Sequence, residues 1–224
     1  MKNIALILAS GTGERCGLNQ PKQFFKVGGK TLLEYSIETF ATHPEINEII
    51  IVANPDFLEE TKKLAGSHTV ISGGATRQES SYNGVMSIDM DDDANILIHD
   101  AVRAFVTQDI ITACIKGLEK HQAICTATET SDTILEVDNN GKIINVPNRK
   151  TLKLAQTPQC FKLDIIKKAH TLAKEQNITV TDDCGLILAN NLADIYVVQG
   201  SSSNKKITYP EDLKFAQWFF EKSI

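Results

Sequence analysis

The chain has 224 residues, enough for one α/β domain with a small appendage. Its 42% apolar and 23% charged residues are ordinary for a globular protein, and the formal net charge of -5 argues against a general nucleic-acid binder, which usually carries a basic face. No apolar stretch approaches the roughly 20 residues of a membrane span and the N-terminus carries no secretory signal, so we expect a cytoplasmic protein without membrane contact.

The five cysteines are scattered along the chain and show no CxxC spacing. An odd number of separated cysteines is typical of reduced thiols, and it argues against a disulfide framework or a zinc site. Small packing residues are therefore the simplest interpretation of the set. Its members are Cys16, Cys114, Cys125, Cys160 and Cys184.

Apolar runs of strand length alternate with amphipathic stretches. Most runs contain consecutive β-branched residues, which is typical of strands buried on both faces. Strands are expected at residues 4–8, 49–53, 69–71, 96–98, 124–127 and 195–198. Helices are expected at residues 31–40, 109–118, 163–172 and 212–220. This alternation predicts an α/β fold with a Rossmann-like, mostly parallel sheet and helices on both faces.

One segment departs from this alternation. Residues 134–137 and 142–144 have strand character, and the Asn-Gly pair between them is a strong hairpin signal because both residue types tolerate a positive φ. A lone two-stranded hairpin is only marginally stable in water. We therefore expect a single domain over residues 1–224 with a β-arm at residues 130–150, here called the arm, that packs on a second copy of the chain.

The first apolar run leads into a glycine-containing loop with positive side chains. Gly11 and Gly13 let backbone amides approach a ligand, and Arg15 and Lys22 supply two cations nearby. This combination suits the phosphates of a nucleoside triphosphate, although both cations could also be ordinary surface residues. A dinucleotide site is disfavoured because Cys16 stands where its fingerprint has a third small residue.

The apolar run at residues 96–98 delivers a polar cluster at its carboxyl end, where ligands bind in open α/β sheets. Asp100 can hold Mg²⁺ through one oxygen while phosphates and water complete the coordination shell. Arg103 could orient Asp100 or a phosphate. His99 is more simply a hydrogen-bonded structural histidine than a general base.

Two further segments have the composition of ligand loops. Gly73 and Gly74 let the backbone approach a flat base, with Ser80 at a helix start, although the glycines could also serve only a local turn. Near the C-terminus, Lys206 lies just ahead of a helix that could begin at Pro210. Each segment alone is weak evidence for a site.

Together, these segments resemble the cytidylyltransferase family that couples CTP to polyol phosphates, whose members include the 2-C-methyl-D-erythritol 4-phosphate and ribitol 5-phosphate enzymes. The resemblance covers essentially the whole chain, and the motifs occur in the family's order. They are Leu8-Ala9-Ser10-Gly11-Thr12-Gly13-Glu14-Arg15, Pro21-Lys22-Gln23, Gly73-Gly74 with Arg77 and Ser80, His99-Asp100-Ala101-Val102-Arg103, Gln156-Thr157-Pro158-Gln159, and Lys206-Ile207-Thr208 before Pro210-Glu211-Asp212-Leu213. The resemblance implies a fold of the nucleotide-diphospho-sugar transferase type, Mg²⁺ as cofactor and a homodimer.

The resemblance also implies a role for each matching position. Arg15 and Lys22 would contact the CTP phosphates and stabilise the pentacoordinate α-phosphorus, while Lys206 would bridge nucleotide and acceptor phosphate. Asp100 would bind Mg²⁺. The cytidine would be held by Ala9, Ser10, Gly11, Gly74, Ala75 and Ser80. The polyol phosphate would be recognised by Thr133, Arg149, Thr157 and Thr181, to which we add Arg103. In the family the arm crosses the dimer, so its residues would serve the site of the other subunit.

Departures from the family pattern concern the acceptor. Ala104 replaces the proline usual after the arginine of the His-Asp motif, and Asn148 stands where the erythritol enzymes often have Asp. Ala101-Val102-Arg103 and Asp182-Asp183-Cys184 look more like the ribitol branch. The sequence leans towards ribitol 5-phosphate or a related wall or capsule polyol phosphate, with 2-C-methyl-D-erythritol 4-phosphate of isoprenoid synthesis as the alternative.

Three other functions compete with a cytidylyltransferase. They are an NAD-dependent oxidoreductase, a sensor that binds CTP without turnover, and a nucleotidyltransferase with another base or acceptor. For a cytidylyltransferase, the acceptor phosphate is itself a competent nucleophile, so no catalytic serine, cysteine or general base is needed. Catalysis would then consist of positioning and charge stabilisation.

Overall fold

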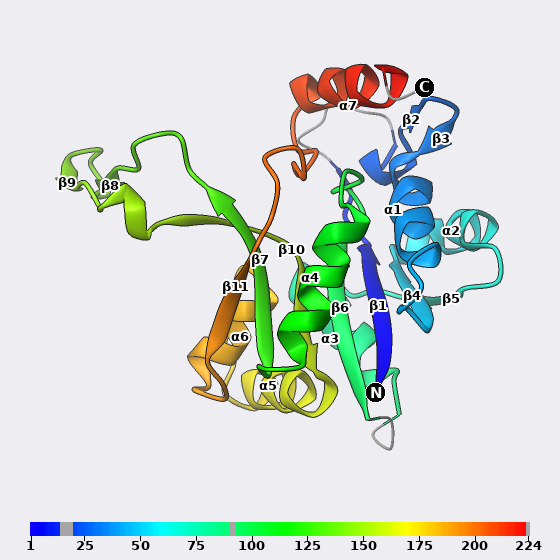
Figure 1. Ribbon diagram of the computed structural model, residues 1–224, viewed down its shortest axis with the longest axis horizontal. Helices are drawn as coiled ribbons and strands as arrows, with labels where there is room; N and C mark the ends of the chain where they lie inside the picture. Colours follow the sequence, from blue (N-terminus) through cyan, green and yellow to red (C-terminus); the bar gives the residue numbers. More distant parts are fainter. Residues whose placement is uncertain (14–19, 90–92, 223–224) are drawn as a thin grey trace.

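The computed structural model describes residues 1–13, 20–89 and 93–222. These residues form a seven-stranded sheet in the order β11-β7-β10-β6-β1-β4-β5 and two separate two-stranded sheets. Neighbouring strands of the main sheet are parallel, except that β10 runs antiparallel to both β6 and β7 (Figure 1). The main strands are β1 (Lys2–Ala9), β4 (Glu48–Ala53), β5 (Thr69–Ser72), β6 (Ala94–Asp100), β7 (Ala123–Glu129), β10 (Lys153–Lys162) and β11 (Ile195–Gln199).

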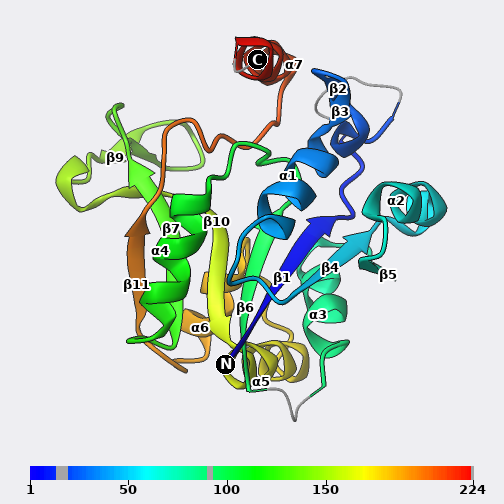
Figure 2. The same ribbon diagram turned by 45° about the vertical axis from the view of Figure 1, so that its right-hand side comes forward.

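Helices cover both faces of this sheet (Figures 1 and 2). They are α1 (Leu32–Ala41), α2 (Leu58–Ala65), α3 (Arg77–Met86), α4 (Gln108–Leu118), α5 (Leu163–Glu175) and α6 (Asp183–Ala189). A further helix, α7 (Pro210–Lys222), contributes to neither of the two cores that flank the sheet. α1, α2 and α4 contribute to the core on one face, and α3, α5 and α6 to the core on the other. None of the helices in the described part of the chain is long and apolar enough to cross a bilayer.

Strand β1 shows why the apolar runs form central strands. Successive side chains of a strand point to opposite faces of the sheet. Accordingly, Ile4, Leu6 and Leu8 join the core on the α3 side, while Ala5 and Ile7 join the core on the α1 side. Because both faces are covered, the strand needs apolar residues at every position, and this produces the continuous run in the sequence.

Each helix and strand expected from the sequence is present, with ends shifted by a few residues at most. The ends follow local capping chemistry. Thr31 and Glu34 form a capping box that begins α1, and Pro210 is the first residue of α7. α7 packs against the short hairpin of β2 (Lys26–Val27) and β3 (Lys30–Thr31) in a separate apolar cluster.

Strand β10 is the main feature that the sequence did not predict. The segment Gln156 to Gln159 is polar and contains Pro158, and a proline argues against a central strand. The structure accommodates it with an irregularity: the pairing with β7 is interrupted between Ala155 and Gln159, where Pro158 has no amide hydrogen to donate. The family motif at residues 156–159 therefore lies inside the sheet, next to β6.

The arm is present as expected and extends away from the sheet (Figure 1). β8 (Glu136–Val137) and β9 (Ile143–Asn145) pair antiparallel, and Gly141 in the connecting turn has a φ of 81°. β8 is shorter than the segment expected at residues 134–137, whereas β9 has the expected length and is shifted by one residue. Apolar side chains of the arm are exposed, namely Ile134, Leu135, Val137, Ile143, Ile144 and Val146.

Candidate active site

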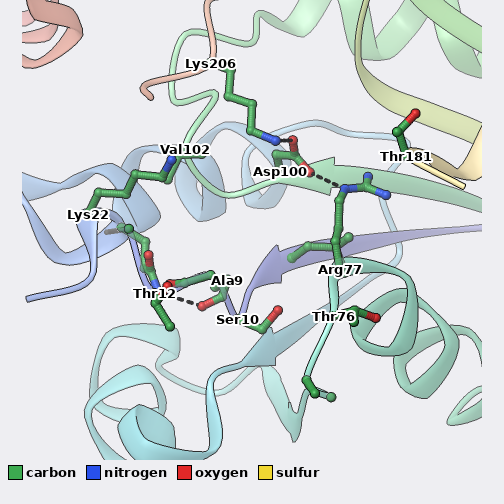
Figure 3. Close-up of a pocket in the computed structure, with 16 residues that line it drawn as sticks. Ala9, Ser10, Thr12, Lys22, Thr76, Arg77, Asp100, Val102, Thr181 and Lys206 are labelled. Carbon is green, nitrogen blue, oxygen red and sulfur yellow. Dashed lines mark hydrogen bonds and ion pairs between the residues drawn. The ribbon is translucent and has the colours of Figure 1, made fainter. Parts of the chain in front are cut away.

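A pocket of about 620 Å³ opens at the carboxyl ends of β1 and β6. The chain goes from β1 to β4 and β5 on one side and then returns to β6 on the other, so the two strand ends diverge there. This is the position at which open α/β sheets bind ligands. The lining residues are Leu8, Ala9, Ser10, Gly11, Thr12, Gly13, Lys22, Gln23, Gly74, Ala75, Thr76, Arg77, Asp100, Val102, Thr181 and Lys206 (Figure 3).

The first loop is held by the segment that carries Lys22. The buried amide of Gln23 donates to the carbonyl oxygens of Ala9 at 2.7 Å and Gly11 at 3.0 Å. Gly13 has a φ of 78°, and a Cβ there would come within 2.8 Å of the Lys22 backbone nitrogen. Glycine is therefore required for the close approach that brings Lys22 to the pocket. Arg15, the other predicted cation, lies outside the described residues.

The second glycine loop packs directly on the first. Ser10 donates from its Oγ to the Ser80 Oγ at 2.7 Å, and the Gly74 amide donates to the same Ser80 oxygen at 3.1 Å. A Cβ on Gly73 would meet both serine side chains at 2.8 Å. Neither Gly73 nor Gly74 has a positive φ. Close approach, rather than a local turn, explains these glycines, and Ser80 lies buried beneath the pocket wall.

A charged cluster lies where β6 ends. Asp100 contacts Lys206 Nζ through Oδ2 at 2.6 Å and Arg77 Nε through Oδ1 at 3.1 Å, as Figure 3 shows. Burial alone would raise the pKa of Asp100, but Arg77 and Lys206 outweigh it and hold the pKa well below its usual range. The carboxylate is therefore ionised at neutral pH.

His99 and Thr157 support this cluster from inside the protein. The Asp100 amide donates to the Thr157 Oγ1 at 3.0 Å, and the same hydroxyl contacts His99 Nδ1 at 3.1 Å. Burial lowers the pKa of His99 to about 3. His99 is thus a neutral, hydrogen-bonded structural residue, as the sequence suggested, and Thr157 faces the backbone of β6 rather than the pocket.

Arg103 also acts within the scaffold in this structure. Its guanidinium donates to the carbonyl oxygens of Asn204 at 2.9 Å and Ala155 at 3.3 Å. These bonds tie the end of β6 to β10 and to the segment that leads to Lys206. Arg103 is not among the residues that line the pocket.

The arm residues lie apart from the pocket of their own chain. Thr133 and Arg149 are exposed, and Arg149 donates to the Ser131 carbonyl oxygen at 2.6 Å. Neither residue lines the pocket. The predicted acceptor residues are therefore divided: Thr181 is at the pocket, whereas Thr133 and Arg149 are on the arm.

Sequence reasoning gave no role to Arg77 and Asp183, two charged residues that the structure brings together. Arg77 is part of the glycine motif, and Asp183 belongs to a polar pair at the start of α6. Each was therefore interpreted from its neighbours in the sequence alone. In the structure Arg77 NH1 lies 2.9 Å from Asp183 Oδ2. The position of Arg77 inside a family motif was the one sequence signal that could have indicated a functional role for it.

The donors present fit a magnesium ion that also binds substrate. Among the described residues, no group of three or more histidine, cysteine or acidic side chains could hold a metal alone. Asp100 is the acid among the pocket-lining residues that the structure describes. One ionised carboxylate suits Mg²⁺, which is usually bound through one or two carboxylates plus substrate phosphates.

Comparisons with known proteins identify the family of the chain. The model of the IspD family, 2-C-methyl-D-erythritol 4-phosphate cytidylyltransferase, matches residues 3–222. The chain is 38% identical to the enzyme of that name from Clostridium botulinum (strain 657 / Type Ba4), over 99% of this chain and 98% of the relative. It is 37% identical to the bifunctional ribulose 5-phosphate reductase/CDP-ribitol pyrophosphorylase of Haemophilus influenzae, over 98% of this chain and 48% of the relative.

A solved structure shares the fold. The crystal structure of 4-diphosphocytidyl-2C-methyl-D-erythritol synthase from Anaerococcus prevotii matches with a TM-score of 0.88 and 31% identity, over 98% of this chain and 96% of that one. The nucleotidyltransferase fold expected from the sequence is confirmed. The chain therefore belongs to the 2-C-methyl-D-erythritol 4-phosphate cytidylyltransferase family and is a cytidylyltransferase.

Proposed function

We propose that the chain transfers the CMP group of CTP to 2-C-methyl-D-erythritol 4-phosphate and releases pyrophosphate. The family model and the Clostridium and Anaerococcus proteins carry this substrate in their names. They favour the erythritol acceptor over ribitol 5-phosphate, towards which the sequence motifs lean. The observation that carries the proposal is the convergence of Lys22, Arg77 and Lys206 with Asp100 in a pocket lined by glycine loops.

The reaction is a displacement at phosphorus. An oxygen of the acceptor phosphate attacks the α-phosphorus of CTP in line, the bond from that phosphorus to the oxygen it shares with the β-phosphate breaks, and pyrophosphate departs with this oxygen. Because the phosphate monoester is already a nucleophile, no side chain needs to accept a proton. Lys22 stabilises the charge on the phosphates of CTP, and Lys206 bridges nucleotide and acceptor phosphate.

The two glycine loops provide the nucleotide site. Cytidine lies between the loop of Ala9, Ser10 and Gly11 and the loop of Gly74 and Ala75. Ser80 acts from below, because its buried hydroxyl joins Ser10 to Gly74. This arrangement presents backbone groups to a flat base, with little side chain in the way.

Mg²⁺ is the cofactor in this proposal, and Asp100 is the residue that would hold it. When bound, the ion neutralises negative charge on the triphosphate and on the departing pyrophosphate. Lys206 Nζ contacts Asp100 Oδ2. Once the carboxylate has another partner, the ammonium group of Lys206 can pair with a substrate phosphate instead.

The active unit in this proposal is a homodimer joined through the arm. The exposed apolar side chains of the arm are unusual for a monomer surface, and a projecting hairpin needs packing partners. Thr133 and Arg149 lie on the same arm, away from the pocket of their own chain. We propose that they contact the acceptor phosphate in the site of a second copy, where Thr181 contributes from the pocket side.

Pyrophosphate release tests the function directly. The chain is incubated with CTP, UTP, ATP or GTP, each with Mg²⁺ and either polyol phosphate, and with reactions lacking acceptor as the control. We expect release with CTP and 2-C-methyl-D-erythritol 4-phosphate. Faster release with ribitol 5-phosphate would show that the acceptor is wrong and favour the second candidate, which the Haemophilus relative and the Asp182-Asp183-Cys184 motif support. Binding of CTP without release would indicate a sensor.

A further inference from the structure

Asp183 is a buried carboxylate that no step of the proposed reaction uses. It is the first residue of α6 and is 1% exposed. Ser81 donates to its Oδ1 at 2.5 Å, and His170 Nε2 lies 3.8 Å from the same oxygen. Burial lowers the pKa of His170, although Asp183 opposes this change. Arg77, 2.9 Å from Oδ2, is therefore the charged partner of Asp183.

Arg77 is shared between two carboxylates. Its Nε contacts Asp100 Oδ1 at 3.1 Å, while its NH1 reaches Asp183 Oδ2. The NH1 contact is an ion pair without hydrogen-bond geometry, and Asp183 Oδ2 has no hydrogen-bond partner among the described residues. The Asp100 contact is a hydrogen bond. With one end held by Asp183, the guanidinium presents a single nitrogen to Asp100 and leaves Asp100 Oδ2 to Lys206.

Asp183 is itself fixed by the sheet. The amides of Asp183 and Cys184 both donate to the Oε1 of Gln159, at 3.0 and 3.1 Å. Gln159 lies on β10, where it pairs with Ile98 of β6. The same strand pair places Thr157 under the Asp100 amide. The β6–β10 strand pair therefore positions both Asp183 and Asp100, and Arg77 contacts the two carboxylates.

We propose that Asp183 is a positioning residue that restrains Arg77 to one oxygen of Asp100 and so leaves the other oxygen, at the pocket, to Lys206. An arginine facing a single carboxylate tends to pair with both of its oxygens. Without the charge of Asp183, Arg77 would turn onto Asp100 and displace Lys206 from Oδ2. This inference rests on the proposed function, because it assigns Asp100 and Lys206 the roles given there.

The test is the substitution Asp183→Asn, which keeps the size of the side chain and an oxygen that can accept from Ser81. We expect kcat to fall roughly 10- to 100-fold, the range that a small misplacement of a catalytic group causes. The KM for CTP should stay within about threefold, because Asp183 touches no substrate. A crystal structure of the variant without ligands should show Arg77 on both oxygens of Asp100 and Lys206 displaced.

Two further variants separate positioning from folding. Asn95→Ala removes another buried polar group, which donates to Asn3 Oδ1 at 2.7 Å at the opposite end of the strands. It should lower the melting temperature without changing kcat. Arg77→Lys provides a second route to the same defect if Asp183→Asn does not fold, because an ammonium group cannot span both carboxylates. Combined with Asp183→Asn, it should cause no loss beyond that of the more severe single variant.

Three results would overturn the inference. Asp183→Asn could retain wild-type kcat, or it could raise the KM for CTP with kcat unchanged, which would mean that Arg77 binds the nucleotide directly. The variant structure could also show Arg77 and Lys206 in their original positions. The structural result does not depend on turnover, so failure of the wild-type chain to release pyrophosphate would refute the proposed function separately.

Discussion

The pocket and the arm differ in whether their side chains find interaction partners within the same chain. In the pocket, Asp100 meets Arg77 and Lys206 of the same chain. On the arm, Leu135 and Ile143 remain 49% and 52% exposed. The pocket is thus preformed in a single chain, whereas the arm has no such partner among the described residues. In the dimer proposed above, charge stabilisation would therefore belong to each subunit and acceptor recognition to the pair.

The largest expected effect comes from removing a cation on the pocket side. Lys22→Ala and Lys206→Ala should each lower kcat by roughly 10²- to 10³-fold, by analogy with loss of one preorganised donor at a developing charge. Arg15→Ala should behave in the same way. Steady-state kinetics with CTP measures the effect, and Lys26→Ala, which removes an exposed lysine from β2, is the control. Activity within a few-fold of wild type would contradict the assigned roles.

Mixing two inactive variants tests the arm side of the comparison. Lys22→Ala damages the pocket and Arg149→Ala damages the arm, so each homodimer should be nearly inactive. If the arm serves the second subunit, mixed dimers contain one intact site, and a co-expressed mixture should recover about a quarter of wild-type activity. Activity no greater than the average of the two parents would mean that arm and pocket act within one chain.

A smaller effect is expected from Gln23, whose side chain holds the first loop of the pocket. Gln23→Ala removes the side-chain amide that donates to the carbonyl oxygens of Ala9 and Gly11, so both oxygens lose this hydrogen bond. The free energy of unfolding should fall by about 1–3 kcal/mol, the cost of leaving buried polar groups unpaired, and the KM for CTP should rise. Urea titration and kinetics measure both quantities. The control is Gln20→Ala, which changes a nearby exposed glutamine. Equal effects of the two substitutions would contradict a role for Gln23 in holding the loop.

The pocket also shows how far sequence reasoning reaches. The strand ends and glycine loops depend on near neighbours in the chain, so apolar runs and glycine positions predicted them. The contact of Arg77 with Asp183 was missed because it joins α3 to α6, far apart in the sequence. Local pattern gives no information about such a pair. The family motif marked the position of Arg77 without revealing its partner.

The orientation of individual side chains was also beyond the sequence. Thr157 was expected to contact substrate, yet its hydroxyl faces the Asp100 amide and His99. This placement follows from β10 running antiparallel beside β6, and Pro158 argued against any strand there. On the arm, the Asn-Gly turn was sufficient to predict the hairpin, because that signal is local.

The smallest effect at neutral pH is that of His99, beneath the pocket, which matters only as the solution becomes acidic. Burial holds its pKa at about 3, whereas an unfolded histidine titrates near 6.5. Between these values the unfolded chain binds a proton that the folded chain does not, so stability declines as the pH falls from about 6.5 towards 3. The contribution approaches about 1.4 kcal/mol per pH unit within that window.

His99→Gln should remove this contribution. Urea unfolding between pH 7 and pH 4 gives the free energy of unfolding at each pH. This free energy should fall less steeply with acid in the variant than in wild type, and the difference in slope should correspond to at most about one bound proton. The pKa values of His43 and His170 are also lowered by burial, and both residues are retained, so part of the wild-type slope should persist. Identical slopes for variant and wild type would show that folded His99 takes up its proton at the same pH as unfolded histidine, and a charge beneath Asp100 would then enter the electrostatics of the pocket in acid.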